Sequence, residues 1–382
     1  MTETGTGVRA AIIGTGMIAA VHHRAIRAAG GVLVGVLGSR PERSAEAAAA
    51  WDCAAHPDLE ALLAADIDVV HVCTPNATHA EFTTAVLKSG RHVVCEKPVA
   101  VTVAQAEGLE ALAAGAGLVA AVPFVYRYHP IVRELRERRI AGQFGPWHAL
   151  HGSYLQDWMM APDTGNWRVH PEAGGRSRAF ADIGSHWCDL VEFTSGERLA
   201  RLTALTSIVV PQRPTGSAQS FTARAAESDA APALEPVTTE DIALVTFQTA
   251  SGTPGSVVVS QVAAGRRNRL WFELDGSAGS AVFDQEAPET AWLGSPDGAQ
   301  VIARGAGRLS AEQARLSYLP GGHPQGYQDC FNAFTADVYA AIAGDAPDGL
   351  PTVADGLRAA RITDAVLASA ASGAWTDIEG TP

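Results

Sequence analysis

The sequence predicts an α/β domain with a parallel sheet, followed by a second domain with a largely antiparallel sheet. Apolar runs alternate with helical segments over residues 8–123, which is typical of parallel strands covered on both faces. After Pro130 the strand-like segments become longer and are separated by turn signals. Because 382 residues also exceed one typical domain, we expect domains over residues 1–125 and 126–382, with helices near the C-terminus free to pack back on the first.

The first domain is expected to consist of apolar strands that end in turn residues, each followed by a helix. Glycines close the first run, and Thr74-Pro75-Asn76 closes the third. Thr102, with Gln105 three residues later, has the spacing of a helix capping box. Strands are expected at residues 8–13, 32–37, 68–72, 92–95 and 118–122, and helices at 17–29, after Pro41, at 78–89 and from Thr102.

The second domain is expected to contain one sheet and a few helices. Turn signals such as Asp275-Gly276 separate its strands. Residues 211–240 are rich in Pro, Ala, Ser, Thr and acids, and we expect an exposed excursion of low order. Strands are expected at residues 148–156, 199–210, 241–248, 256–262, 270–274 and 280–283, and helices at 131–140, 182–194, 327–343 and 354–371.

The composition argues against several function classes. The formal net charge of −13 disfavours non-specific binding to nucleic acid or an anionic membrane. No apolar stretch approaches the roughly 20 residues that span a bilayer, and the short polar N-terminus has no export signal, so we expect a cytoplasmic protein. The five cysteines lack C-x-x-C spacing and are expected to be free thiols. We expect no metal site, and we interpret His22 and His23 as packing residues.

A glycine-rich turn follows the first predicted strand and opens a helix. Gly14 permits a tight turn, and Gly16 lets the backbone approach a pyrophosphate. The helix N-terminus, with Met17 and Ile18, offers unpaired N–H groups to phosphates. The pattern therefore predicts a dinucleotide site, although a tight turn without a ligand has the same sequence.

The end of the second strand bears on the choice of cofactor. Enzymes that use NAD usually carry an acid there, which binds the ribose 2′-hydroxyl. Here the strand is followed by Ser39 and Arg40, which suit a 2′-phosphate. We therefore expect NADP to be favoured over NAD, unless Arg40 is only a solvated loop residue.

Three residues have the chemistry for moving a proton to and from a hydroxyl group. Lys97 follows a buried strand, at the edge where parallel sheets bind ligands. Asp182 and His186 are four residues apart and share one face if that segment is helical. Each also has a structural interpretation: Lys97 could pair with Glu96, Asp182 could cap a helix, and His186 could be a histidine satisfied within the core.

Taken together, these motifs resemble the glucose–fructose oxidoreductase/inositol dehydrogenase/MocA family. The resemblance rests on the turn at residues 14–19, Cys73-Thr74-Pro75-Asn76 with His79, Glu96-Lys97-Pro98, and Gly174-Gly175 before residues 182–186. It implies a Rossmann domain and an α+β domain whose open, mostly antiparallel sheet forms homodimers or homotetramers. It also implies an NAD(P)-dependent dehydrogenase or reductase of sugars, anhydrosugars or polyols, with motifs similar to a levoglucosan dehydrogenase subgroup.

The resemblance also implies roles for individual residues. The Trp167-Arg168 pair would approach the nicotinamide, and strand residues from Tyr154 onward would line the substrate pocket, although aromatic residues suit a surface strand equally well. The loop Arg176-Ser177-Arg178 is more polar than in relatives. The expected cofactor-binding residues are Gly14, Gly16, Met17, Ile18, Ser39, Arg40, Thr74, Pro75, Asn76, His79, Glu96, Lys97, Trp167 and Arg168. The expected substrate-binding residues are Lys97, Arg127, Tyr154, Gln156, Asp157, Asp182, His186 and His323.

We expect the oxidation of a ring hydroxyl to divide among the three candidate catalytic residues. His186 would be the general base, because imidazole titrates near neutral pH. Asp182 would orient it or a neighbouring hydroxyl, and Lys97 would stabilise the developing alkoxide; the alternative is that Lys97 is the base. Two rival functions are an NAD-dependent glycosidase of the same family and a non-catalytic dinucleotide sensor.

Overall fold

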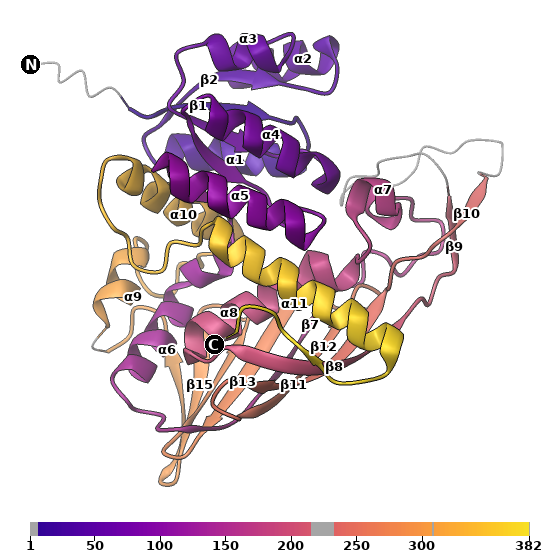
Figure 1. Ribbon diagram of the computed structural model, residues 1–382. Helices are drawn as coiled ribbons and strands as arrows, with labels where there is room; N and C mark the ends of the chain where they lie inside the picture. Colours follow the sequence, from indigo (N-terminus) through magenta and orange to yellow (C-terminus); the bar gives the residue numbers. More distant parts are fainter. Residues whose placement is uncertain (1–6, 215–232, 308, 382) are drawn as a thin grey trace, which may run out of the picture. The chain divides into compact units, whose positions relative to one another are not determined.

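The computed structural model describes residues 7–214, 233–307 and 309–381 (Figure 1). The chain forms two compact units. The first runs to Val125 and also contains Tyr327–Leu357; the second runs from Tyr126 to Gly326 and resumes at Arg358. None of the described helices is long and apolar enough to cross a membrane.

The first unit contains a six-stranded parallel sheet within the described residues, in the order β3-β2-β1-β4-β5-β6. The sequence prediction of a parallel α/β sheet is confirmed, and strands β2 and β5 have the predicted bounds; β3 and α3 were not predicted. The elements are β1 (Arg9–Ile13), α1 (Met17–Ala28), β2 (Val32–Leu37), α2 (Pro41–Trp51), β3 (Ala54–Ala55), α3 (Leu59–Ala64), β4 (Val69–Val72), η1 (Asn76–Thr78), α4 (His79–Lys88), β5 (His92–Cys95), α5 (Val103–Ala116), β6 (Ala120–Ala121) and α10 (Tyr327–Ile342).

The strand register of the first unit brings several loops to one edge of the sheet. Ile13 lies opposite both Leu37 and Val72, and Val72 lies opposite Cys95. The strands β1, β2, β4 and β5 therefore end together. The strand order also reverses between β1 and β4, and a parallel sheet binds ligands at such a switch point.

The second unit contains a nine-stranded sheet within the described residues, in the order β16-β15-β14-β13-β7-β12-β11-β8-β17. The pair β7–β12 is parallel and the other neighbours are antiparallel, so the prediction of a mostly antiparallel sheet is confirmed. The strands are β7 (Trp147–Leu155), β8 (Leu199–Ser207), β11 (Ile242–Thr249), β12 (Pro254–Ser260), β13 (Arg269–Gly276), β14 (Ser280–Asp284), β15 (Thr290–Ser295), β16 (Gly298–Ala303) and β17 (Thr376–Asp377).

Helices cover one face of this sheet (Figure 1). Trp187 on α8 is fully buried, and its Nε1 donates to the carbonyl oxygen of Trp271 at 2.9 Å. A Cβ at Gly152 would lie 2.6 Å from Trp187 Nε1, so a side chain there would displace the helix. The second unit also contains η2 (Val125–Tyr128, whose first residue belongs to the first unit), α6 (Pro130–Ile140), η3 (Trp167–Val169), α7 (Pro171–Gly174), η4 (Phe180–Gly184), α8 (Ser185–Ser195), α9 (Ala311–Leu316) and most of α11 (Val353–Ser372).

The other face of the nine-stranded sheet carries exposed apolar side chains. Leu244 lies opposite Leu205 on one neighbouring strand and opposite Val258 on the other, so all three project from the same face. Their exposed fractions are 43%, 65% and 41%. We call this surface the open face of the sheet.

The prediction of low order for residues 211–240 is wrong where the structure describes them. Strand β9 (Gln212–Pro214) pairs antiparallel with β10 (Leu234–Pro236), and Arg213 is buried. The pairing follows from the ladder of backbone hydrogen bonds, which polar and proline-rich composition does not reveal. The middle of the predicted excursion, residues 215–232, lies outside the described residues. The two strands β15 and β16 and the helix α9 were also not predicted.

Candidate functional site

The turn between β1 and α1 is packed tightly against the neighbouring strand ends. Gly14 has a φ of +115°, and its N–H donates to the carbonyl oxygen of Leu37 at 2.8 Å. A Cβ at this position would overlap the backbone carbonyl of Cys73. Glycine is therefore required here by both conformation and space.

Gly16 is not required by packing within the described chain. Its φ of −77° is ordinary, and an added Cβ would meet nothing within 4 Å. Gly16 is the N-cap of α1, which has no side-chain cap and no acidic residue in its first turn. The helix N-terminus thus presents backbone N–H groups and positive potential, and no side chain at Gly16 blocks the approach of a ligand. This arrangement fits the pyrophosphate of a dinucleotide.

The end of β2 carries polar residues at the same edge. Ser39 and Arg40 are exposed, and Arg40 is the N-cap of α2. The first acidic residue beyond β2 is Glu42, in the first turn of that helix. A basic, exposed side chain thus stands at the position where NAD-specific folds usually carry an acid.

The loops after β4 and β5 are tied together by His79. Its Nδ1 lies 2.7 Å from the carbonyl oxygen of Pro98, and its Nε2 lies 2.8 Å from that of Thr74. Burial lowers the pKa of His79, although the two carbonyl acceptors and Glu96 act in the opposite direction. Since both ring nitrogens face backbone carbonyls, His79 positions the Thr74 and Pro98 loops rather than presenting a nitrogen to a ligand.

Glu96 belongs to a buried polar chain that sequence reasoning missed. His22 Nε2 lies 3.0 Å from Glu96 Oε1, and His22 Nδ1 lies 2.9 Å from His71 Nδ1. Tyr339 on α10 continues the chain to His71 Nε2 at 3.4 Å. Burial raises the pKa of Glu96, but the His22 hydrogen bond and the Lys97 charge outweigh it, so this pKa lies below its ordinary value. His22 is buried, as predicted, but it also has a polar role.

Lys97 follows Glu96 directly, at the carboxyl end of β5. It is half-buried, and the Lys97–Pro98 peptide bond is cis. Its backbone N–H donates to Glu96 Oε2 at 3.1 Å. The other Glu96 oxygen is bound by His22, so the glutamate anchors the backbone of the loop that carries Lys97.

In the second unit, Asp182 lies in a π-helical turn, η4, rather than in the predicted regular α-helix. Such single turns are frequent at functional sites. Gln261 Nε2 donates to Asp182 Oδ2 at 2.8 Å, and Arg168 Nε lies 3.6 Å from Oδ1. The Arg168 guanidinium also stacks on the Trp167 ring, 4.4 Å from its centroid. The Trp167-Arg168 pair and Asp182, predicted separately, thus form one cluster.

His186 lies one turn further along, in α8, and is 6% exposed. Its ring meets the Tyr126 ring edge to face at 4.8 Å. The Tyr126 hydroxyl lies 2.7 Å from that of Tyr154, which donates to Asn268 Oδ1 at 2.7 Å. Gln156 Nε2 donates to the same oxygen at 2.7 Å. Tyr154, predicted to bind substrate, is buried in this network, and Gln156 forms its half-exposed end.

The loop before η4 is fixed by buried charges. Glu240 accepts hydrogen bonds from Ser177 Oγ at 2.7 Å and from the Phe180 N–H at 2.9 Å. Arg178 pairs with Asp241, and both side chains are fully buried. Burial raises the pKa of Asp241, but Arg178 outweighs it and holds this pKa below its ordinary value. The polarity of residues 176–178 therefore has a structural cause in Ser177 and Arg178.

The remaining predicted residues lie in different surroundings. Arg127 forms an ion pair with Asp189, with Nε donating to Oδ2 at 2.9 Å, and both side chains are buried. Asp157 accepts from the Gly265 N–H at 3.2 Å. His323 is exposed in a turn, with Nδ1 3.3 Å from the carbonyl oxygen of Pro320.

The structure thus brings together two sets of predicted residues. At the sheet edge of the first unit are the Gly14 turn, Ser39-Arg40, Thr74-Pro75-Asn76 and Glu96-Lys97. In the second unit, Arg168 and Gln261 both contact the Asp182 carboxylate. Sequence reasoning missed His71, Gln261 and Asn268; each stands in or beside a strand, but no local spacing links any of them to its partners.

The parallel sheet, with a glycine turn and an uncapped helix at its switch point, defines a dinucleotide-binding protein. Residues 8–124 match the family described as oxidoreductase family, NAD-binding Rossmann fold, and residues 132–282 match the GFO/IDH/MocA C-terminal domain. The chain belongs to the GFO/IDH/MocA family of oxidoreductases. The family predicted from the motifs is confirmed, as are the Rossmann fold and enzymatic character.

Three similar proteins illustrate this relationship. Levoglucosan dehydrogenase of Pseudarthrobacter phenanthrenivorans is 30% identical over 329 residues, which cover 82% of this chain and 80% of that protein. The crystal structure of an oxidoreductase domain protein from Kribbella flavida has a TM-score of 0.87 and 32% identity, covering 98% of this chain and 99% of that one. A levoglucosan dehydrogenase in complex with NADH and levoglucosan has a TM-score of 0.86 and 28% identity, covering 97% and 99%.

Proposed function

We propose that the protein is an NAD(P)-dependent dehydrogenase or reductase that transfers a hydride between a ring hydroxyl of a sugar, anhydrosugar or polyol and the nicotinamide. The observation that carries this proposal is the similarity to levoglucosan dehydrogenase over 82% of the chain. The Gly14–Gly16 turn and the Asp182 cluster supply a dinucleotide site and a group of polar side chains of the kind such a reaction needs. Anhydrosugars are the first substrates to test.

The proposed cofactor is NAD(P), held at the N-terminus of α1 and by the loops after β2, β4 and β5. When bound, the nicotinamide supplies the hydride acceptor or donor. We propose that NADP is favoured over NAD, since exposed Ser39 and Arg40 follow β2. His79 would act by holding two of these loops, rather than by touching the cofactor.

For the proton, we propose that His186 is the general base for the substrate hydroxyl. Asp182 is held by Gln261 and Arg168, and it would orient His186 or a neighbouring substrate hydroxyl. Lys97 would stabilise the alkoxide that develops as the proton leaves. Arg127 contacts Asp189, and Tyr154 contacts Asn268. From these contacts we propose that Arg127 and Tyr154 have structural roles in the second unit.

A substrate panel tests the proposed function. Levoglucosan, monosaccharides and inositols would each be incubated with NAD⁺ and with NADP⁺, and formation of reduced nicotinamide would be followed by absorbance. We expect reduction with at least one ring polyol. Release of an aglycone from a glycoside without net cofactor reduction would instead identify the glycosidase alternative. Binding of dinucleotide with no turnover of any panel member in either direction would contradict the proposal.

We also propose that the open face of the nine-stranded sheet is buried in a homodimer or homotetramer. The row of Leu205, Leu244 and Val258 exposes contiguous apolar surface on long strands, which is unfavourable in a monomer. Light scattering at micromolar concentration is expected to give a mass of at least two chains. A strict monomer would contradict this proposal.

A further inference from the structure

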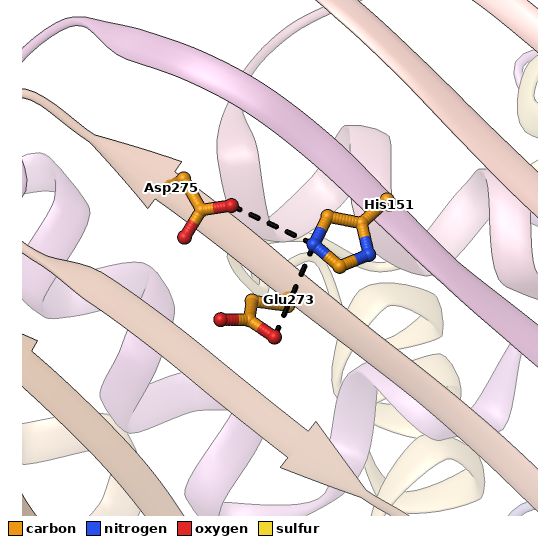
Figure 2. A group of neighbouring side chains, drawn as sticks. All are labelled: His151, Glu273 and Asp275. Carbon is orange, nitrogen blue, oxygen red and sulfur yellow. Dashed lines mark ion pairs between the residues drawn. The ribbon is translucent and has the colours of Figure 1, made fainter.

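A histidine and two carboxylates converge on the open face of the nine-stranded sheet. His151 on β7 lies directly opposite Glu273 on β13, and Asp275 lies two residues further along β13. Because side chains alternate along a strand, all three project from the same face. Figure 2 shows them pointing toward one another: His151 Nε2 lies 3.9 Å from Glu273 Oε2 and 3.6 Å from Asp275 Oδ2.

The separation of these atoms suits coordination of one metal ion. The three potential ligand atoms all lie within 4.8 Å of one another. Bonds of about 2.0–2.2 Å to a zinc-like ion place neighbouring ligand atoms about 3.0–3.5 Å apart. The two histidine–carboxylate distances, 3.9 and 3.6 Å, exceed this spacing by less than about 1 Å. Rotation of the two carboxylate side chains would bring the three ligand atoms closer together.

The surroundings of the cluster support its arrangement. Ser280 Oγ donates to Asp275 Oδ1 at 2.8 Å, which orients the carboxylate so that Oδ2 faces His151. The His151 ring packs against the Trp271 ring, with the two ring centroids 5.4 Å apart. Among the described residues, the ion pairs of Glu273 and Asp275 are both with His151.

We propose that His151, Glu273 and Asp275 form a binding site for a divalent transition-metal ion. One imidazole and two carboxylates suit zinc or manganese, whereas magnesium and calcium prefer ligands that are all oxygen. The site uses none of the residues assigned to hydride transfer. Its ligands join β7 to β13, so the ion is expected to stabilise the sheet. Sequence analysis predicted no metal site, since His151 stands more than 100 residues from the two carboxylates.

Zinc titration of the full chain tests the site. Metal would be removed with a chelator, and Zn²⁺ binding would be measured by calorimetry for wild type, His151→Ala, Glu273→Gln and Asp275→Asn. We expect one site per chain with micromolar or tighter affinity, and at least a roughly tenfold loss in each variant. The matched control is His148→Ala, which removes a second histidine of β7; His148 is exposed and belongs to no such cluster in the described residues.

Thermal unfolding gives a second measurement that does not depend on activity. Zn²⁺ should raise the Tm of wild type and His148→Ala, because it binds the folded state, and should not raise that of His151→Ala. Circular dichroism would establish that each variant is folded. Absence of Zn²⁺ binding by wild type, or equal binding by wild type and His151→Ala, would overturn the proposal. Equally tight binding of Mg²⁺ or Ca²⁺ would overturn the assignment of a nitrogen ligand.

Discussion

The two units assemble their functional residues in different ways. In the first unit, every candidate residue lies within seven positions of a strand end, and parallel register brings those ends to one edge. In the second unit, the Asp182 carboxylate is held by a hydrogen bond from Gln261, which is 79 positions away. The His151 cluster likewise depends on how β7 is paired with β13.

This difference shows where a short sequence motif is enough to predict the position of a functional residue. A parallel sheet places the residue after each strand at a common edge, whatever the rest of the sequence. An antiparallel sheet places residues by register, and a slip of one residue would move His151 to the opposite face from Glu273. We therefore expect a substitution in the first unit to remove the contribution of one residue to function. A substitution in the second unit is expected to affect several interacting residues together.

The largest effect should come from residues proposed to act on the substrate. His186→Ala is expected to lower turnover by roughly 10²–10⁴-fold with little change in cofactor affinity, because it removes the proposed general base. Lys97→Ala should also lower turnover strongly. If the two act together, the double variant should be little worse than the poorer single variant.

Single-turnover measurement of hydride transfer distinguishes catalytic from structural roles for these residues. His148→Ala serves as the control for loss of a histidine from the second unit, and wild-type rates are expected for it. Wild-type hydride transfer in both His186→Ala and Lys97→Ala would refute the proposed catalytic roles. Fully additive losses would show that the two residues act independently.

The next largest effect should come from Gly14→Val. The branched side chain would collide with the carbonyl of Cys73, and the φ of +115° disfavours valine. Dinucleotide binding, measured by fluorescence quenching or calorimetry, should fall below detection while circular dichroism shows a largely intact fold. Gly108→Ala in α5, where an added Cβ meets nothing, should bind normally. Normal affinity in Gly14→Val would refute the assignment of the turn.

Acid should destabilise the first unit through His71. Burial, followed by the neighbouring His22, holds the pKa of His71 well below its ordinary value, so the folded state keeps it neutral. In the unfolded chain it takes up a proton below about pH 6.5, and stability is lost as the pH falls, by up to about 1.4 kcal/mol per pH unit. Urea unfolding of wild type and His71→Gln between about pH 7.5 and about pH 5.5 measures this slope. An equal slope in both proteins would contradict the prediction.

The smallest effect is expected from Arg40→Ala. The exposed guanidinium would contribute one charged contact to a 2′-phosphate, so the Michaelis constant for NADP should rise several-fold. The constant for NAD provides the internal control and should change little. If wild type strongly prefers NAD and the variant alters neither constant, Arg40 is only a loop residue.

Sequence reasoning found most of the regular elements because hydrophobic periodicity is local. It missed β15 and β16; every residue of β16 except Ile302 is exposed, and the strand carries no alternating apolar pattern. It also placed Asp182 in a regular helix, because nothing in the local residue pattern indicated a turn with i→i+5 hydrogen bonds. The burial of Arg178 with Asp241 was equally invisible, since a charged loop residue gives no local sign of its partner.

The sequence by itself determined the dinucleotide turn, the family and the candidate residues Lys97, Asp182 and His186, since each stands in a contiguous motif. Tertiary structure alone decided the side-chain contacts, such as that of His22 with Glu96 and that of Gln261 with Asp182. It also decided the convergence of His151 with two carboxylates. The physical reason is that backbone conformation follows neighbours along the chain. Side-chain pairing across a sheet depends on register, which the whole core selects.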